Sequence, residues 1–159
     1  MLGHWADLIS SGRVDDFGEQ EILPDFLEKF FVGLLGYTRP AGHQRYTIRY
    51  EHHIDVEGDY ADAVLGDFNG GNRYVVALEG KGPRDPLDRP YGGRRRSAVE
   101  QAYQYAINLQ CDWIIVTSIR QTRLYHKGSN QHTYERFDTE RLADDENVSS
   151  KGCFPCQAA

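Results

Sequence analysis

A short turn-forming segment, Asn-Gly-Gly-Asn at residues 69–72, constrains the fold of this 159-residue chain more than any other feature. Glycine and asparagine accept the positive φ angles that tight β-turns require. Residues 60–68 and 73–81, on either side, are rich in β-forming residues. The pattern therefore predicts a β-hairpin. If the turn is centred between Gly70 and Gly71, residues whose numbers sum to 141 oppose each other.

This register places Asp62 opposite Glu79, about 5 Å apart at Cβ. Lys81 lies two residues further on and projects from the same face as Glu79. Neighbouring carboxylates repel one another, and a hard cation such as Mg²⁺ or Mn²⁺ relieves that cost. A bound metal activates water and stabilises charge on a phosphodiester, and a lysine orients the nucleophile. The alternative is a cross-strand salt bridge on a solvated face, since Glu-x-Lys occurs in many chains.

Composition indicates one globular domain, with 40% hydrophobic and 12% aromatic residues. We expect that domain to span residues 1–145, and residues 146–159 to form an irregular tail where the chain is truncated. No segment has the roughly 20 apolar residues of a membrane span or the core of a signal peptide. We therefore expect a cytoplasmic protein without a membrane partner. Cys153 and Cys156 have C-x-x-C spacing but no second Cys/His pair to complete a zinc site.

The basic residues are concentrated next to the predicted carboxylate pair. The net charge of −6 argues against indiscriminate nucleic-acid binding, but six of the eighteen Lys and Arg residues fall within residues 81–96. Prolines and glycines in that stretch predict a surface loop, and a basic loop beside a metal site suits a phosphate backbone. Alternatively, Asp85 and Asp88 partly balance a merely solvated loop. The candidate nucleic-acid contacts are Arg84, Arg89, Arg94, Arg95 and Arg96.

Hydrophobic periodicity predicts the elements before the hairpin. Apolar positions at helical spacing predict a helix over residues 22–35, with Gly36 as its C-terminal stop. Pro24 fits best in the first turn of that helix. Residues 45–56 alternate between apolar and polar positions, with Ile48 and Ile54 on the same apolar face, which predicts one half-buried strand.

After the basic loop, Ser97 and Glu100 form a capping-box pattern that opens a helix to about residue 110. Gln101 and Tyr105 stand four residues apart on that helix and are able to touch. The apolar run 112–117 predicts a strand covered on both sides, and residues 122–127 and 132–137 predict two short strands. The order is helix, three strands, helix, strand and a terminal strand pair, an α/β fold with a mixed central sheet flanked by helices.

This order of elements, together with Asp62, Glu79, Lys81, Gln101 and Tyr105, resembles the PD-(D/E)XK nuclease superfamily. The helix with Gln-x-x-x-Tyr is similar to its RecB-type branch. More narrowly, residues 19–137 resemble the N-terminal nuclease domain of type IIG-like restriction-modification enzymes, in which the nuclease is fused to a DNA methyltransferase. The resemblance implies a restriction-endonuclease-like fold with an αβββαβ core.

The resemblance also implies roles for individual residues. Asp62 and Glu79 would hold Mg²⁺ or Mn²⁺, and Lys81 would assist catalysis. Gln101 and Tyr105 would help to position the site or the DNA. Members often add an acidic residue from the first helix, for which the candidates are Glu19 and Glu21. The proline of the family name is replaced by Ala61 in this chain.

The function implied is a Mg²⁺-dependent DNA endonuclease in a restriction-modification or other phage-defence system. Its expected partners are DNA, a methyltransferase and target-recognition domain in the same or another chain, and a second copy in a homodimer. This chain carries no Asn-Pro-Pro-Tyr methyltransferase motif and no P-loop. Two alternatives stay open: a Holliday-junction or repair nuclease acting as a homodimer, and a catalytically inactive, nuclease-like DNA-binding module.

Overall fold

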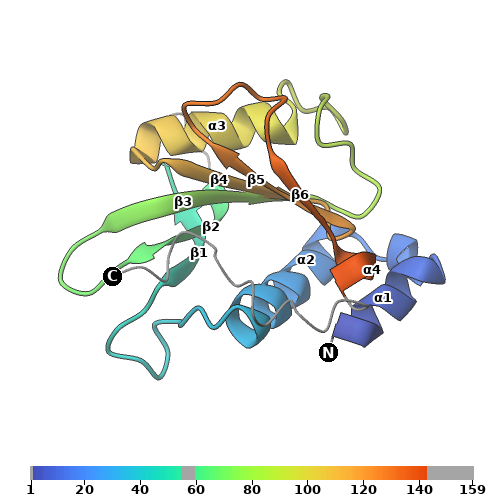
Figure 1. Ribbon diagram of the computed structural model, residues 1–159, viewed down its shortest axis with the longest axis horizontal. Coiled ribbons are helices and arrows are strands. Elements are labelled where there is room, and N and C mark those ends of the chain that lie inside the picture. The colour runs from blue at the N-terminus through green and yellow to red at the C-terminus, as the bar shows by residue number, and fades with distance from the viewer. Residues whose placement is uncertain (1, 55–59, 143–159) are drawn as a thin grey trace.

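A six-stranded mixed β-sheet forms the centre of the molecule (Figure 1). The structure is a computed structural model that describes residues 2–54 and 60–142. Strands follow the sheet in chain order, and all neighbours are antiparallel except the parallel pair β3 and β4. The strands are β1 (Ile48–His53), β2 (Tyr60–Asp67), β3 (Arg73–Gly80), β4 (Trp113–Thr117), β5 (Gln121–His126) and β6 (Glu135–Asp138).

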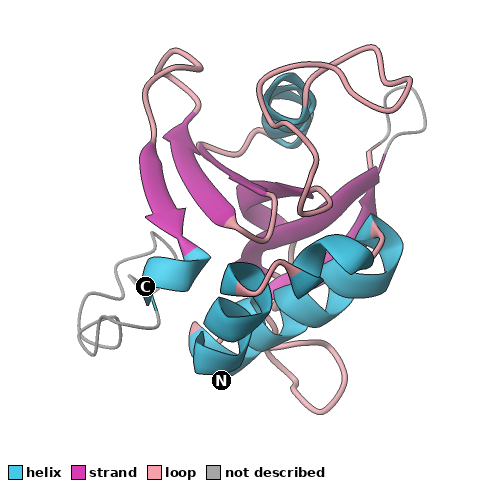
Figure 2. Cartoon of the chain, turned by 90° about the vertical axis from the view of Figure 1, so that its right-hand side faces the viewer, coloured by secondary structure: helices cyan, strands magenta, loops and turns pink. Residues whose placement is uncertain are grey.

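Helices cover both faces of the sheet, which confirms the predicted mixed α/β class (Figures 1 and 2). The helix α3 lies on one face and connects β3 to β4, because parallel neighbours need a crossover. The helices α1, α2 and α4 lie on the other face. The helical elements are α1 (Leu2–Ser10), the 3₁₀ turn η1 (Arg13–Asp16), α2 (Glu19–Leu27), the π-helix η2 (Glu28–Leu34), α3 (Ala98–Leu109) and α4 (Thr139–Leu142).

The hairpin of β2 and β3 has the predicted register in its inner part, where Ala63 pairs with Leu78. Nearer the turn the pairing shifts by one residue, so that Gly66 pairs with Tyr74. The extra residue is Val75, so the β-bulge that produces this shift lies on β3, opposite Gly66. The strand opposite the bulge needs glycine, because a Cβ at Gly66 would lie 2.0 Å from the carbonyl oxygen of Arg73. The predicted opposition of Asp62 and Glu79 therefore depends on the bulge as well as on the position of the turn.

The strand predicted at residues 45–56 is shorter and less regular than expected. It covers only Ile48–His53, and Glu51 has a positive φ of 48° that interrupts the alternation. Ile48 packs in the core beneath α2, whereas Ile54 packs in the core beneath α3. The prediction that both share one face is therefore wrong. Residues 55–59 lie outside the described part of the chain.

The helix predicted at residues 22–35 begins three residues earlier, at Glu19, and changes from α to π geometry at Glu28. Pro24 lies inside α2 rather than in its first turn. A proline has no N–H and crowds the preceding turn, so it weakens regular α-helical bonding at this point. Gly36 ends the helical segment with a φ of 77°, as predicted.

The second half of the chain follows the predictions closely. The helix α3 has Ser97 as N-cap, with both hydrogen bonds of the capping box to Glu100. The strands β4 and β5 start within one residue of the predicted positions, and β6 starts three residues late. No helix in the described part of the chain is long and apolar enough to cross a membrane. Cys153, Cys156 and the expected domain boundary near residue 145 lie outside the described residues.

Candidate active site

The C-terminal end of β3 carries the Glu-x-Lys motif, and β4 holds its backbone in place. Glu79 pairs with Val116 and Gly80 with Thr117 in the parallel ladder. The amide of Lys81 continues that ladder by donating to the carbonyl of Thr117 at 2.8 Å. The motif is thus fixed by strand pairing rather than placed on a free loop.

Asp62 and Glu79 lie next to each other at this end of the sheet. The backbone amide of Gly80 donates to Asp62 Oδ2 at 2.7 Å, and Lys81 Nζ forms an ion pair with Glu79 Oε1. Glu79 is 1% exposed and Lys81 is 5% exposed. Glu79 Oε2 is buried and has no hydrogen-bond partner among the described residues. Half of this carboxylate is therefore unsatisfied inside the protein, which is costly unless another group binds it.

Burial is the largest influence on both carboxyl groups. It raises the pKa of Glu79 to about 8, with the Asp62 charge adding to the rise and Lys81 opposing it. Burial also raises the pKa of Asp62, against the hydrogen bond from Gly80 and the charge of Lys81. The charge of Glu19 raises both pKa values, so all three carboxylates belong to one electrostatic cluster.

The raised pKa of Glu79 predicts that, without divalent metal, stability falls as pH rises from about 4.5 to 8. Over that range the unfolded chain has released a proton that the folded protein retains, so rising pH favours unfolding. The expected loss is on the order of a few kcal/mol, because each unit of pKa difference corresponds to about 1.4 kcal/mol. Urea unfolding in EDTA across this range measures the slope, and Glu79→Gln should make it shallower. An equal slope in the variant would contradict the assignment.

Glu19 and Glu21, at the start of α2, were the two candidates for an additional acidic residue in the site. Glu19 is the one that interacts electrostatically with Asp62 and Glu79. The amide of Gly82, directly after Lys81, donates to Glu19 Oε2 at 3.3 Å. Glu21 is exposed and lies on the wall of a neighbouring cavity. The resemblance alone did not distinguish the two residues, because Pro24 left the start of the helix open.

The basic loop does not act as a uniform positive surface. Arg94 turns toward the site, where its Nη2 donates to Glu19 Oε2 at 3.1 Å and to Asp85 Oδ2 at 2.8 Å. Arg84 instead donates to the backbone carbonyl of Asp15 in η1. The remaining candidates, Arg89, Arg95 and Arg96, are exposed.

A buried arginine on β5 anchors the same loop, a role that was not predicted from the sequence. Arg123 is 6% exposed and makes a bidentate ion pair with Asp88, at 2.6 and 3.0 Å. Its guanidinium also lies over the ring of Tyr134, 4.6 Å from the ring centre. The sign of this role in the sequence is an arginine within the predicted strand 122–127. Its partner Asp88 lies 35 residues earlier in the chain, so no short pattern reveals the ion pair.

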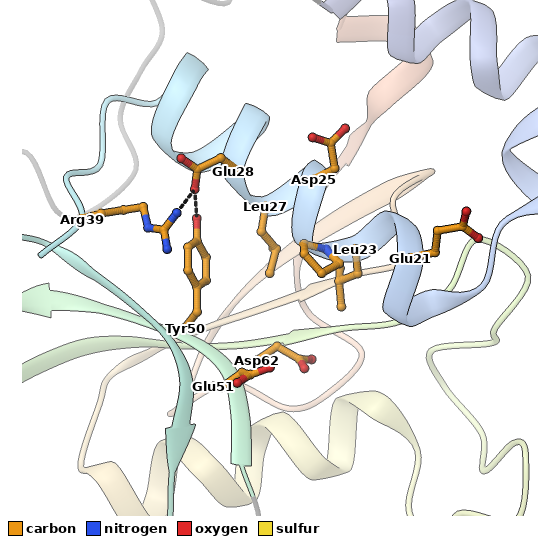
Figure 3. Close-up of a pocket in the computed structure, with 10 residues that line it drawn as sticks. Glu21, Leu23, Asp25, Leu27, Glu28, Arg39, Tyr50, Glu51 and Asp62 are labelled. Atoms are coloured by element: carbon orange, nitrogen blue, oxygen red, sulfur yellow. Dashed lines mark hydrogen bonds and ion pairs between the residues drawn. The ribbon is translucent and has the colours of Figure 1, made fainter. Parts of the chain in front are cut away.

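A cavity of about 440 Å³ opens beneath α2, on the side of Asp62 away from the basic loop (Figure 3). Figure 3 shows Asp62 and Glu51 at its floor and Leu23 and Leu27 on the helix above. At one end Glu28 binds both the guanidinium of Arg39, at 3.2 Å, and the hydroxyl of Tyr50, at 3.1 Å. The cavity is therefore mostly acidic and apolar.

Gln101 and Tyr105 contact each other on α3, as their spacing predicted. The side-chain amide of Gln101 donates to the hydroxyl of Tyr105. Tyr105 is 1% exposed and packs in the core between α3 and the sheet, whereas Gln101 is half-buried. This packing gives Tyr105 a structural role, and a functional role for either residue stays a prediction.

The oxygen donors of the site suit a hard divalent cation. They come from three carboxylates, and one of these, Glu79, has a buried oxygen without a partner among the described residues. Within residues 2–54 and 60–142, however, no three Asp, Glu, His or Cys side chains are gathered closely enough to hold a metal ion. Lys81 and Arg94 pair with two of the three carboxylates. These two cations balance the negative charge that a metal would otherwise balance.

Comparisons of the chain with family models, with curated proteins and with solved structures found no match.

Proposed function

We propose that this protein is a Mg²⁺-dependent DNA endonuclease with a restriction-endonuclease-like fold. The observation that carries the proposal is the buried carboxylate of Glu79, which has one oxygen paired with Lys81 and the other without a partner. A carboxylate that serves only stability would gain from complete hydrogen bonding or from apolar replacement. Here it is kept beside Asp62, whose charge raises its pKa further. Such perturbed pairs are typical of functional sites.

Each residue of the site would have its own role in the reaction. Asp62 and Glu79 would hold the cation, with Glu19 as a third acidic group within electrostatic reach. A bound Mg²⁺ would supply an activated water and stabilise charge on the phosphodiester. Lys81, fixed by β4 through its backbone, would orient the attacking water or neutralise charge on the phosphate. The arginines of the basic loop would bind backbone phosphates on either side.

The wider biological role follows from the same proposal. A nuclease of this kind would act in a restriction-modification or other phage-defence system in the cytoplasm. A methyltransferase and a target-recognition domain, in the same or another chain, would then supply sequence specificity. The acidic cavity beside Asp62 supports approach of DNA from the side of the basic loop, because its carboxylates would repel the phosphate backbone.

Metal binding is the direct test. Calorimetric titration should show Mn²⁺ binding to the wild type and none to the double variant Asp62→Asn, Glu79→Gln. Supercoiled plasmid should be cleaved with Mg²⁺ and stay intact in EDTA. The absence of any Mg²⁺ or Mn²⁺ binding by the wild type would reject the proposal.

Two other results of the same assays would redirect the assignment. DNA binding without metal binding or cleavage would indicate a nuclease-like DNA-binding module. The absence of a three-ligand group in the described residues is the observation that favours this second candidate. A strong preference for branched over linear DNA would instead indicate a junction or repair nuclease.

A further inference from the structure

The side chain of Arg94 points toward the carboxylate cluster, unlike that of Arg84. Its guanidinium is shared between Glu19 and Asp85, and its side chain is 31% exposed. The side chain of Arg84 is 65% exposed and reaches Asp15 in η1 instead. Glu19 in turn accepts a hydrogen bond from Gly82. Arg94 is therefore connected, through Glu19, to the backbone that directly follows the Glu-x-Lys motif.

Electrostatic effects place the same guanidinium within reach of the whole carboxylate cluster. The charge of Arg94 lowers the pKa of Asp62, and the charge of Glu79 acts on Arg94 in return. Arg94 thus interacts with Glu19 by direct contact and with the other two carboxylates through space. A cation in that position competes with any metal ion that Glu19 would help to bind.

We infer that Arg94 is an exchangeable counter-ion that becomes the ligand of the reacting phosphate. In the metal-free protein it neutralises Glu19. Once the Glu19 carboxylate turns to a bound cation, Arg94 loses that partner and offers its freed donors to a phosphate oxygen of DNA. A guanidinium suits this exchange because its planar fork binds carboxylate and phosphate in the same geometry. The inference rests on the proposed nuclease function and deepens it.

Asp85 is the residue that keeps Arg94 in place during the exchange. Its side chain is 14% exposed, and its own amide donates to the carbonyl of Gly82 at 3.0 Å in a tight turn. An acid held in this way stays bound to one side of the guanidinium after Glu19 has left. Asp85 is therefore a positioning residue for Arg94.

Metal affinity gives a test that needs no catalysis. If Arg94 competes for Glu19, Arg94→Ala should bind Mn²⁺ more tightly than wild type, by about three- to fivefold, the upper range for partly exposed ion pairs. Arg95→Ala is the matched control, because it removes the same charge from the next, exposed position. Its Mn²⁺ affinity should stay within about twofold of wild type, since screening weakens the effect of distant exposed charges.

The phosphate role is tested with the same two variants at saturating DNA. Arg94→Ala should lower the single-turnover cleavage rate by about tenfold or more, because a donor to the reacting group is lost. Arg95→Ala should weaken DNA binding, with a log–log salt slope smaller by about 0.9, and should lower the saturated rate less than Arg94→Ala does. Asp85→Asn should also lower the saturated cleavage rate, as Arg94→Ala does. Arg94→Lys keeps the positive charge but lacks the planar guanidinium. Its Mn²⁺ affinity and its saturated cleavage rate should therefore lie between those of wild type and Arg94→Ala.

The outcomes separate this inference from the proposed function. If wild type binds Mn²⁺ but Arg94→Ala binds it equally or more weakly, Arg94 is no counter-ion and the inference fails while the nuclease proposal stands. If Arg94→Ala binds Mn²⁺ more tightly yet cleaves at the wild-type saturated rate, the phosphate role fails. If wild type binds no divalent metal, the proposed function itself is rejected. Urea unfolding confirms that each variant is folded, and Arg94→Lys carries both tests if Arg94→Ala does not fold.

Discussion

Glu79→Gln should reduce metal-dependent DNA cleavage by about 100-fold or more without lowering the stability of the metal-free protein. The amide keeps the size of the side chain and still offers Lys81 an oxygen, but it removes the charge that would bind the cation. Loss of one electrostatic stabiliser typically costs a factor of about 100 to 1,000 in rate. Stability should not fall, because burial disfavours the charged form of Glu79 and one of its oxygens has no partner.

Cleavage rates with saturating Mg²⁺ and urea unfolding in EDTA measure the two effects on the same samples. Glu135→Gln, at an exposed position on β6, is the matched control and should change neither rate nor stability. A Glu79→Gln protein that cleaves at the wild-type rate would exclude Glu79 from the active site. A variant that is inactive because it is markedly less stable would instead indicate a structural ion pair with Lys81.

The second large effect concerns the fold, at the bulge of the β2–β3 hairpin. Gly66→Ala should destabilise the protein by about 3 kcal/mol or more, at the upper end for single substitutions. The new Cβ would lie 2.0 Å from the carbonyl oxygen of Arg73, a backbone atom that moves only if the strand pairing opens. Gly71→Ala is the control, because a Cβ there meets no atom within 4 Å. It should change stability by no more than about 0.5 kcal/mol.

Urea or thermal unfolding of both variants gives the comparison. Equal stability of Gly66→Ala and Gly71→Ala would show that β2 tolerates a side chain opposite the bulge and that the close contact of Gly66 with β3 is unimportant. A destabilised Gly66→Ala protein should also bind Mn²⁺ less well when folded, because a change in register separates Asp62 from Glu79.

Local signals explain which parts of the fold were predictable from sequence. The hairpin turn and the capping box of α3 depend on residues within a few positions of one another, so both were predicted with close bounds. The opposition of Asp62 and Glu79 follows the pairing of Ala63 with Leu78. The bulge opposite Gly66 was not anticipated, because a single glycine in a strand does not reveal which backbone atom approaches it.

Other features depend on tertiary contacts that no short pattern records. The positive φ of Glu51 breaks an alternation that looked regular over twelve residues. The contact between Arg94 and Glu19 joins positions 75 residues apart. All loop arginines carry the same charge, so nothing in the sequence separates Arg94 from the others. Its contact with the carboxylate cluster is visible in the structure.

The anchoring of the basic loop has a consequence for how fast this protein would capture its target. The amide of Lys81 ties the loop to Thr117 of β4 and Arg123 ties it to β5, while Leu87 is buried and accepts a hydrogen bond from the amide of Val99. A segment fixed at three points loses little conformational entropy when a ligand arrives. Association with DNA should therefore proceed in one kinetic phase at a rate set by diffusion and ionic strength, with no slow ordering step after the first encounter.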